Sequence, residues 1–272
     1  MFLFVGILPL LLLPFLATIL PESLQFLLLR RDRPHTIAPV IRKLFPRFEL
    51  AGRTVVARRT SQPGVSPVRR LFTGRLKNYT FLLWTTYFLN LFVVYIISNW
   101  LPTVIAQHGM SLSTASIVVG AFQIGGTVGA LALGYFMDQG KPERVLTRAY
   151  LVGAIFIAVL GIVSSSPIGL AVCIFLAGAC VSGSMTGVNA LASGIYPTES
   201  RATGVGWSMG VGRLGAVTGS AAGAWLFSLN PQTAFVLIAL PPLGISAAMA
   251  VLGRIRSAAD PSTSSPKREL RP

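Results

Sequence analysis

Acidic residues, cysteines and histidines are scarce in this sequence, and their scarcity excludes several kinds of site. The chain has 8 Asp and Glu, 2 Cys and 2 His among its 272 residues. Cys173 and Cys180 are seven positions apart on one apolar segment, about 10 Å of helical rise, which is too far for a disulfide between them. His35 and His108 have no second His, Cys or paired carboxylate nearby. The sequence therefore predicts no metal site and no cofactor.

Catalytic groups are also missing from the long apolar segments. No Asp, Glu, Lys or His lies inside one of them, and Glu22, Asp138 and Glu199 stand at their ends. An enzyme working inside a membrane would need a nucleophile with a base, or a metal cluster, at membrane depth. We therefore expect no catalytic residues and a protein that is not an enzyme.

Apolar residues, in contrast, make up 53% of the chain and give it a mean hydropathy of +0.68, outside the range of soluble domains. The sequence predicts an all-α membrane protein with seven transmembrane helices. Their runs are long enough to cross a hydrocarbon core of about 30 Å: Met1 to Leu20, Tyr79 to Leu101, Leu112 to Met137, Val145 to Val163, Ile168 to Ser193, Thr203 to Phe227 and Ala234 to Leu252. A cleaved signal peptide is the alternative for the first run, which lacks a basic start and a small-residue cleavage pattern.

Basic residues alternate between the two ends of these runs. Of the 23 Lys and Arg, 13 lie between Arg30 and Lys77, and the others, apart from Arg213, lie in the loop after Met137, at Arg201 and in the tail. The three intervening loops contain none: Pro102 to Ser111, Ser164 to Pro167 and Ser228 to Thr233. By the positive-inside rule, the basic segments and the C-terminus face the cytoplasm and the N-terminus faces outward. The charge therefore indicates the lipid bilayer as a partner, and not nucleic acid.

Four parts are expected along the chain. They are a transmembrane helix at 1–20, a cytoplasmic basic linker at 21–77, a six-helix bundle at 78–253 and a disordered cytoplasmic tail at 254–272. The linker holds amphipathic stretches such as PVIRKLFPRFEL. Its basic face could lie on anionic lipid headgroups, and a solvated, partly disordered linker is the other interpretation.

One charge breaks the apolar pattern, because Arg213 stands near the middle of the run from Thr203 to Phe227. A cation at the bilayer centre costs about 2.5 to 3.5 kcal/mol on insertion scales, so it is seldom kept without a partner or a water-filled cavity. A planar guanidinium is well suited to a carboxylate. We therefore interpret Arg213 as a binding group for a small carboxylate.

A few uncharged polar and aromatic residues also lie near mid-depth: Tyr87, Asn90, Tyr95, Gln123 and Asn189. Tyr87 and Asn90 are three positions apart and therefore share a helix face. For Asn90, Gln123 and Asn189, hydrogen bonding between helices is an equal alternative. The predicted substrate-binding residues are Arg213, Asn90, Tyr87, Gln123 and Asn189.

Glycines recur at four-residue intervals in two of the runs. The sets are Gly125 and Gly129, Gly206 and Gly210, and then Gly215, Gly219 and Gly223. Small residues at this spacing let two helices approach closely. We therefore expect these helices to pack tightly against their neighbours.

Opposite charges gather at the predicted cytoplasmic helix ends. GYFMDQGKPER places Gly134, Asp138 and Arg144 around a tight turn, and YPTESRATG places Glu199 and Arg201 before a later run. Such charges can form a network that holds one conformation closed and opens in another. Loose surface ion pairs of little energy are the alternative. These five residues are the candidate conformational switch.

Four segments resemble the major facilitator superfamily, and most closely its aromatic acid:proton symporter branch: LPES, FLNLFVVYIISNWLPTVI, GYFMDQGKPERVL and YPTESRATGVGWSMGVGRLGAVTG. The resemblance implies that the seven runs correspond to the sixth to twelfth helices of a twelve-helix fold. It also implies that Asp138 and Arg144 lie in the switch loop of the second half, and that Arg213 faces the central cavity. The implied substrates are benzoate-like acids such as 4-hydroxybenzoate, taken up with protons.

The resemblance leaves the first five helices of that fold without a counterpart, including the acidic first-helix motif tied to proton coupling. Substrate sites in such folds lie between two halves. We therefore expect a fragment of a proton-coupled organic anion symporter in the bacterial inner membrane, not competent alone, which a complementary N-terminal half could complete. The alternatives are a seven-span receptor and a membrane-assembly protein that binds another chain through its glycine faces.

Overall fold

The computed structural model of this chain describes residue 14 and residues 66–107, 111–163 and 166–259. The chain divides into two compact units, Met1–Pro63 and Gly64–Pro272, and every helix named below belongs to the second. Apart from Pro14, the predicted span from Met1 to Leu20 lies outside the described residues, as do the linker up to residue 65 and the tail from residue 260.

The described part of the second unit consists of helices joined by short connections. The long helices are α5 (Gly74–Gln107), α6 (Leu112–Gln139), α7 (Pro142–Val163), α10 (Thr198–Ser228) and α11 (Pro231–Ala259). The shorter ones are α4 (Pro67–Leu71), α8 (Pro167–Val181) and α9 (Ser184–Ile195). The predicted all-α class is confirmed, and α11 runs on to Ala259, past the predicted end of the bundle at 253.

Most of these helices have the length and composition of membrane spans. Five segments qualify by these measures: Gly74–Ala106, Ser113–Gln139, Pro142–Val163, Ile168–Ile195 and Gln232–Ala258. α10 is of similar length, but glycines, hydroxyl residues and Arg213 dilute its apolar residues. The chain is thus a multi-pass membrane protein, and α10 is the one long helix of the described part whose hydropathy alone does not identify it as a span.

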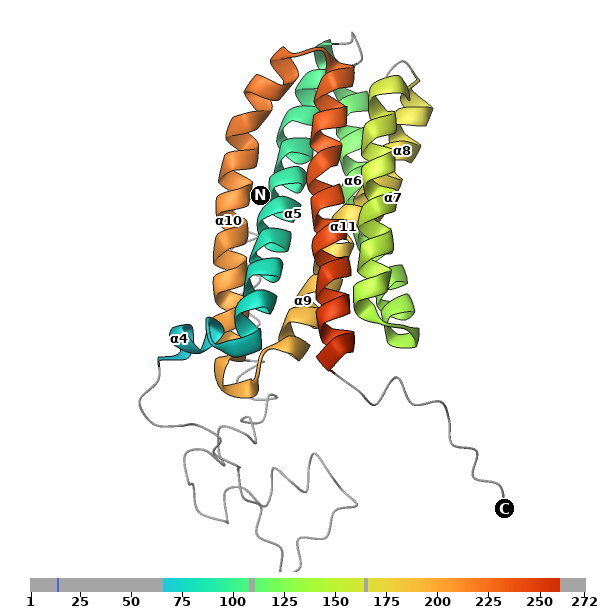
Figure 1. Ribbon diagram of the computed structural model, residues 1–272. Helices are drawn as coiled ribbons and strands as arrows, with labels where there is room; N and C mark the ends of the chain where they lie inside the picture. The colour runs from blue at the N-terminus through green and yellow to red at the C-terminus, as the bar shows by residue number, and fades with distance from the viewer. Residues whose placement is uncertain (1–13, 15–65, 108–110, 164–165, 260–272) are drawn as a thin grey trace, which may run out of the picture. The chain divides into compact units, whose positions relative to one another are not determined.

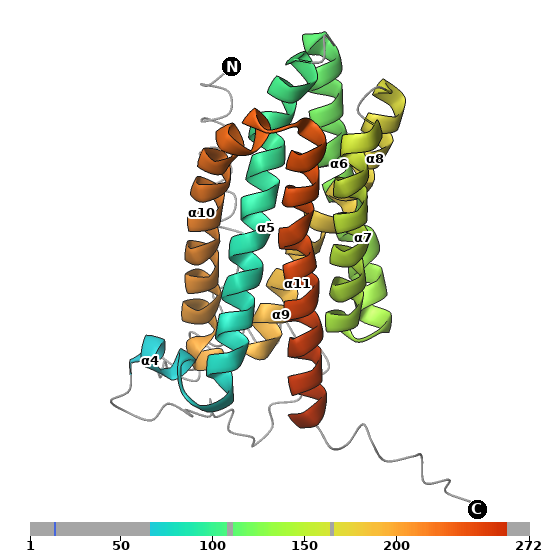
Figure 2. The same ribbon diagram turned by 45° about the horizontal axis from the view of Figure 1, so that its top comes forward.

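The helices run alternately up and down the bundle. α5, α7 and α10 begin at the lower end in Figure 1, where α6, α9 and α11 finish. The turned view in Figure 2 places α5 between α10 and α11, with α7 next to α11. Buried apolar side chains fill the interior, among them Ile96 of α5, Ile157 of α7 and Ile245 of α11, all 0% exposed. Because α5 and α7 begin and α6 and α11 end at the lower end, the described basic residues outside α10 lie together near that end, as the positive-inside pattern requires.

The glycine face of α10 packs directly on the backbone of α5. A Cβ added to Gly215 would lie 2.1 Å from the carbonyl oxygen of Phe88, and one added to Gly219 would lie 2.3 Å from that of Phe92. A Cβ on Gly223 would meet the indole of Trp100 at 2.2 Å. Because no side chain fits there, the two helices approach as closely as small residues allow, and the predicted tight packing is confirmed on this face.

A second close contact joins α6 to α8. A Cβ added to Gly125 or Gly129 would lie 2.1 Å from the carbonyl oxygen of Phe175 or Ala179 respectively. The prediction is not met for Gly206 and Gly210 among the described residues, since none of these has an atom within 4 Å of a Cβ added to either glycine. Those two glycines lie on the face of α10 that points away from α5, where no helix of the described bundle covers them.

The predicted span from Ile168 to Ser193 lies within one candidate span, Ile168–Ile195, but it consists of two helices, because α8 ends at Val181 and α9 begins at Ser184. At the break, Gly183 N–H bonds back to the carbonyl of Gly178 at 3.0 Å, and Met185 N–H bonds to Ser182. The Val181 carbonyl is therefore left out of the helical ladder. A Cβ on Gly183 would lie 2.7 Å from the backbone nitrogen of Ala130, so the break occurs where the chain passes close to α6.

Candidate binding site

Arg213 lies in the middle of α10, 15 residues from either end, or about 22 Å of helical rise. Its side chain is exposed, and Nη1 donates a hydrogen bond to Oη of Tyr95 on α5 at 3.2 Å. Within the described residues no carboxylate forms an ion pair with it. Most of its N–H donors therefore remain available to an anion.

The surface beside Arg213 is open because two glycines precede it on the same face of α10. Gly206 and Gly210 stand seven and three positions before it, and helical periodicity places all three on one side. In the part of the chain that the structure describes, no neighbour lies within 4 Å of a Cβ added to either glycine. The face of α10 that carries Arg213 is thus bare backbone on its N-terminal side, while the guanidinium bonds to Tyr95 on α5.

Tyr87 and Asn189 form a hydrogen bond between α5 and α9. Oη of Tyr87 donates to Oδ1 of Asn189 at 2.5 Å, and the Tyr87 side chain is fully buried. Asn189 is half-buried, and its Nδ2 has no acceptor among the described residues. Gly212, the neighbour of Arg213, packs on Tyr87, with an added Cβ 3.3 Å from the Tyr87 carbonyl oxygen. The Tyr87–Asn189 pair therefore lies next to α10, the helix that carries Arg213.

Asn90 has a different environment. It is 0% exposed, and its Nδ2 donates to Oη of Tyr150 on α7 and to the carbonyl of Val181, both at 2.9 Å. The second bond satisfies the carbonyl that the break between α8 and α9 leaves free. Tyr87 and Asn90 lie three positions apart on α5, but their side chains bond to different helices. Asn90 makes the interhelical bonds that were the alternative interpretation of its role.

Gln123 lies on an exposed part of α6. Its backbone carbonyl accepts a hydrogen bond from Oγ1 of Thr127 at 3.2 Å. No hydrogen bond within the described residues joins its amide to Arg213 or to the Tyr87–Asn189 pair. The structure thus leaves its side chain accessible but does not bring it into direct contact with the other predicted site residues.

A polar row along α5 and α10 continues from Arg213. One turn after Tyr95, Asn99 donates from Nδ2 to Oγ of Ser220 at 2.8 Å, and Trp100 Nε1 donates to the Ser220 carbonyl at 2.8 Å. Asn99 and Ser220 were not among the predicted site residues. The signal that could have found them is the four-residue spacing of Tyr95 and Asn99, which places two polar groups on one face of an apolar helix.

Among the candidate switch residues whose side chains the structure describes, none is joined to another. Asp138 and Arg144 are exposed at the end of α6 and the start of α7, and no ion pair links them. No described neighbour lies within 4 Å of a Cβ added to Gly134. Arg201 donates from Nε to the Tyr196 carbonyl at 3.5 Å. The Glu199 side chain lies outside the described residues.

A different ion pair connects the lower ends of α7 and α11. Oε1 of Glu143 lies 2.6 Å from Nη1 of Arg256, with the two side chains 7% and 48% exposed. Sequence reasoning missed this pair because Arg256 was assigned to the tail after residue 253. The extra turns of α11 carry the arginine onto the start of α7.

Known proteins match this chain over most of its length. The family model described as Major Facilitator Superfamily matches two overlapping stretches, residues 1–168 and 83–272. A gallate transporter of Pseudomonas putida is 42% identical over 263 residues, which cover 96% of this chain and 58% of that protein.

The names of two further relatives include an aromatic acid. A 4-hydroxybenzoate transporter of Pseudomonas putida is 36% identical, over 92% of this chain and 55% of its own length. A benzoate transport protein of Acinetobacter baylyi is 32% identical, over 88% of this chain and 51% of its own length. The chain spans a little over half the length of the curated relatives that it matches.

Proposed function

Because the chain belongs to the major facilitator superfamily, we propose that it is the C-terminal part of a proton-coupled symporter of aromatic acids. The named relatives carry gallate, 4-hydroxybenzoate and benzoate, all of them ring carboxylates. The observation that supports the proposal most strongly is the exposed guanidinium of Arg213 in the middle of an apolar bundle, without a carboxylate partner in the described residues. Family membership does not favour the seven-span receptor or the assembly protein.

The proposed recognition begins with the carboxylate of the substrate. A guanidinium can bind a carboxylate with two parallel N–H···O bonds, and Tyr95 holds one end of the Arg213 side chain while leaving the other donors free. The ring would lie along the open backbone at Gly206 and Gly210. Gln123 and the free Nδ2 of Asn189 are proposed to bind ring substituents, with Tyr87 orienting Asn189.

The proposed site needs a second wall. Arg213 is exposed on the surface of the bundle, and substrate sites in transporters of this kind lie between two repeats near the midplane. We therefore propose that an N-terminal half, in the same polypeptide or in a separate one, closes the site. That half would also supply the proton-binding carboxylate, because the described helices carry no Asp or Glu between their end turns.

The proposed orientation places the lower end of the bundle in the cytoplasm of a bacterial inner membrane, together with the C-terminus. Arg75, Lys141 and Arg201 are located at that end, as the positive-inside rule predicts. Asp138, Arg144, Arg201 and the Glu143–Arg256 pair are proposed to form and break contacts with the N-terminal half as the cavity alternately opens and closes.

The experiment combines this chain with the N-terminal half of the related gallate transporter in one membrane. Uptake of radiolabelled gallate and 4-hydroxybenzoate is measured with and without a protonophore. We expect uptake only when both halves are present, with collapse on addition of the protonophore. Arg213→Gln should reduce uptake about 100-fold, because a buried charged hydrogen bond lost on one side costs about 2 to 5 kcal/mol, and Arg213→Lys should restore part of it.

The matched control is Arg69→Gln, which removes one exposed arginine at the end of the bundle, on α4. It should transport as the parent does. If Arg213→Gln took up aromatic acid as fast as Arg69→Gln at equal membrane levels, the anion-binding role of Arg213 would be wrong.

A further inference from the structure

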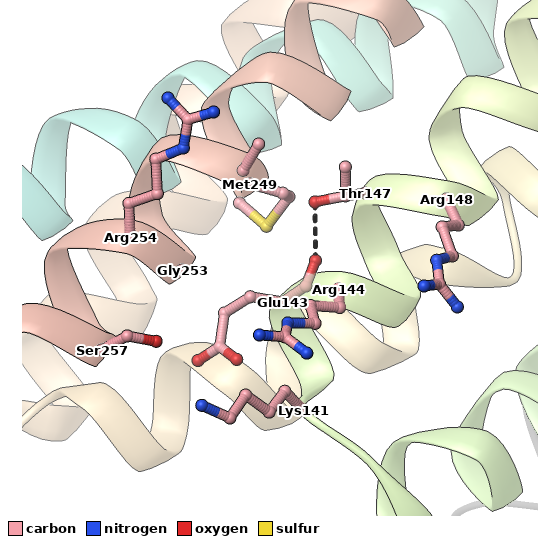
Figure 3. A pocket seen from close by; sticks show the side chains of 10 residues that line it. Lys141, Glu143, Arg144, Thr147, Arg148, Met249, Gly253, Arg254 and Ser257 are labelled. Carbon is pink, nitrogen blue, oxygen red and sulfur yellow. Dashed lines mark hydrogen bonds between the residues drawn. The ribbon is translucent and has the colours of Figure 1, made fainter. Parts of the chain in front are cut away.

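A basic pocket lies at the lower end of the bundle, between α7 and α11 and away from Arg213. Its volume is about 420 Å³, and its charged lining consists of Lys141, Glu143, Arg144, Arg148 and Arg254. Figure 3 shows the side chains of α7 and the preceding turn on one side, with Gly253 and Ser257 of α11 across from Glu143. Two helices that are distant in the sequence thus build one cavity.

The single carboxylate of this pocket is already neutralised. Glu143 forms the ion pair with Arg256 at 2.6 Å, and its backbone carbonyl accepts a hydrogen bond from Oγ1 of Thr147, with 2.7 Å between the two oxygens. In the described part of the chain, Lys141, Arg144, Arg148 and Arg254 form no ion pair. Four cationic groups around one cavity repel each other, and an anion placed among them would relieve that repulsion.

An apolar stripe on α7 leads directly into the pocket. Arg144, Arg148, Leu151, Ile155 and Ile162 recur at intervals of three, four or seven residues, so they lie on one face of the helix. The apolar members are well exposed, with Ile155 at 56% and Ile162 at 76%. The face is therefore apolar along its length and basic at its lower end.

α11 repeats this arrangement in the opposite direction along the chain. Val236, Leu240, Leu243 and Val251 are exposed, and the helical repeat places them on the same face as Arg254. From Val236 to Val251 the stripe extends over 15 residues, or about 22 Å. Because α7 and α11 lie side by side in both views, the two apolar stripes end in arginines at the same level.

We propose that this pocket binds the headgroup of an anionic phospholipid, with the acyl chains lying along the apolar stripes of α7 and α11. A phosphate oxygen accepts charge-assisted hydrogen bonds from Lys and Arg, and a basic pocket between membrane helices on the cytoplasmic side suits an anionic headgroup. A soluble phosphate could use the same cations, but the two stripes lead into the pocket and face the hydrocarbon of the bilayer, so acyl chains lie next to these cations. The lipid is therefore the occupant that accounts for both halves of the surface.

The experiment measures lipid binding to the full chain, purified in a neutral detergent, by native mass spectrometry. Phosphatidylglycerol is titrated against phosphatidylcholine of the same acyl length, and sn-glycerol 1-phosphate serves as the soluble headgroup probe. The test variant is Lys141→Gln/Arg148→Gln/Arg254→Gln, which keeps Arg144 for its proposed switch role. The matched control, Arg69→Gln/Arg75→Gln/Lys77→Gln, removes the same charge from exposed positions on α4 and α5 at the same end.

We expect the parent to prefer phosphatidylglycerol and the test variant to lose that affinity on the order of 100-fold, because each basic group near an anionic surface contributes about 1 kcal/mol. The control should keep the preference within about threefold. Equal losses in both variants would overturn the proposal in favour of general surface attraction. Displacement of the lipid by equimolar glycerol phosphate would overturn it in favour of a soluble anion.

Folding is checked by the helical circular dichroism of each variant. Should the triple variant lose helicity, Arg148→Gln/Arg254→Gln replaces it, since both side chains are exposed. Retention of full phosphatidylglycerol affinity by that double variant would overturn the proposal. None of these readouts requires transport, so the result is independent of the proposed symport function.

Discussion

The α5–α10 seam and the α7–α11 seam each join two long helices but differ in helix direction, packing and outer surface. In the first, the helices run parallel, glycines bring backbone onto backbone, and the outer surface carries Arg213 with Tyr95. In the second, the helices run antiparallel and the outer surface is apolar down to the basic pocket and the Glu143–Arg256 ion pair at one end. The polar seam is suited to facing another protein half or a ligand, and the apolar seam is suited to facing lipid.

The comparison also shows how each seam is held together. In the α5–α10 seam, the close glycine contact provides dispersion contacts, and few side chains lose entropy on packing. The two helices cannot accommodate an added side chain there. The α7–α11 seam uses side chains, including Glu143–Arg256 and the hydroxyl of Ser246, which donates to the Thr147 carbonyl at 2.9 Å. Such contacts can be weakened one at a time. The two seams should therefore respond differently to substitution.

The largest effect is expected from filling the glycine face. Gly215→Leu would force its side chain into the Phe88 carbonyl, 2.1 Å from the added Cβ, and should lower the free energy of unfolding by about 3 kcal/mol or more because the helices must separate. Gly210→Leu on the open face of the same helix should change it by less than about 0.5 kcal/mol. Unfolding in detergent followed by circular dichroism measures both. Equal destabilisation would show that the two faces do not differ.

The second largest effect is expected from the buried amide of Asn90, which bonds to Tyr150 on α7 and to Val181 at the end of α8. Asn90→Leu would leave the buried Tyr150 hydroxyl and the Val181 carbonyl without the Nδ2 donor, and should destabilise by about 1 to 3 kcal/mol. Asn99→Leu, which removes the exposed hydrogen bond to Ser220, should cost less than about 1 kcal/mol. The same unfolding measurement ranks them, and the reverse order would contradict a structural role for Asn90.

The ion pair of the α7–α11 seam should break asymmetrically. Arg256→Gln leaves the carboxylate of Glu143, 7% exposed, without its partner, and should cost about 1 to 3 kcal/mol. Glu143→Gln leaves an arginine that is 48% exposed and should cost less than about 1 kcal/mol, because water solvates the freed charge. Thermal unfolding of the two single variants tests this order. Equal costs would mean that the pair is effectively at the surface.

The smallest effect is expected at the support of Arg213. Tyr95→Phe removes the hydroxyl that accepts from Nη1 at 3.2 Å, and should raise the KM for aromatic acid about tenfold in the two-half uptake assay, since one hydrogen bond to a charged group contributes about 1.5 kcal/mol. Tyr79→Phe, on the lower part of α5, is the control. An unchanged KM in Tyr95→Phe would remove Tyr95 from the site.

Much of the architecture could be predicted from periodicity and charge. The runs from Tyr79 to Leu252 lie in helices, apart from one break, and the described Lys and Arg outside Arg213 lie near one end of the bundle. The break at Ser182 and Gly183 was not predicted, because the apolar pattern continues through it unchanged. The cause is tertiary, since close passage by Ala130 and the bond from Asn90 decide it.

The candidate site was predicted less completely than the fold. Arg213 could be singled out because a charge at membrane depth is costly whatever surrounds it. Tyr87 and Asn90 could not be told apart, since both are polar, three positions apart and on the same helix. Only the neighbours on α7, α8 and α9 separate them, because those helices supply Tyr150, Val181 and Asn189 as partners.

Composition and the spacing of charges were enough to predict a helical membrane protein with its basic residues at one end and a cation at mid-depth. These features depend on the hydropathy of each segment alone, and not on its neighbours in space. The tertiary structure decided which glycines touch a neighbour, which amide is buried and which carboxylate meets Arg256. Those outcomes depend on where helices distant in the sequence approach each other, and backbone contact at Gly215 and Gly219 sets that approach for α5 and α10.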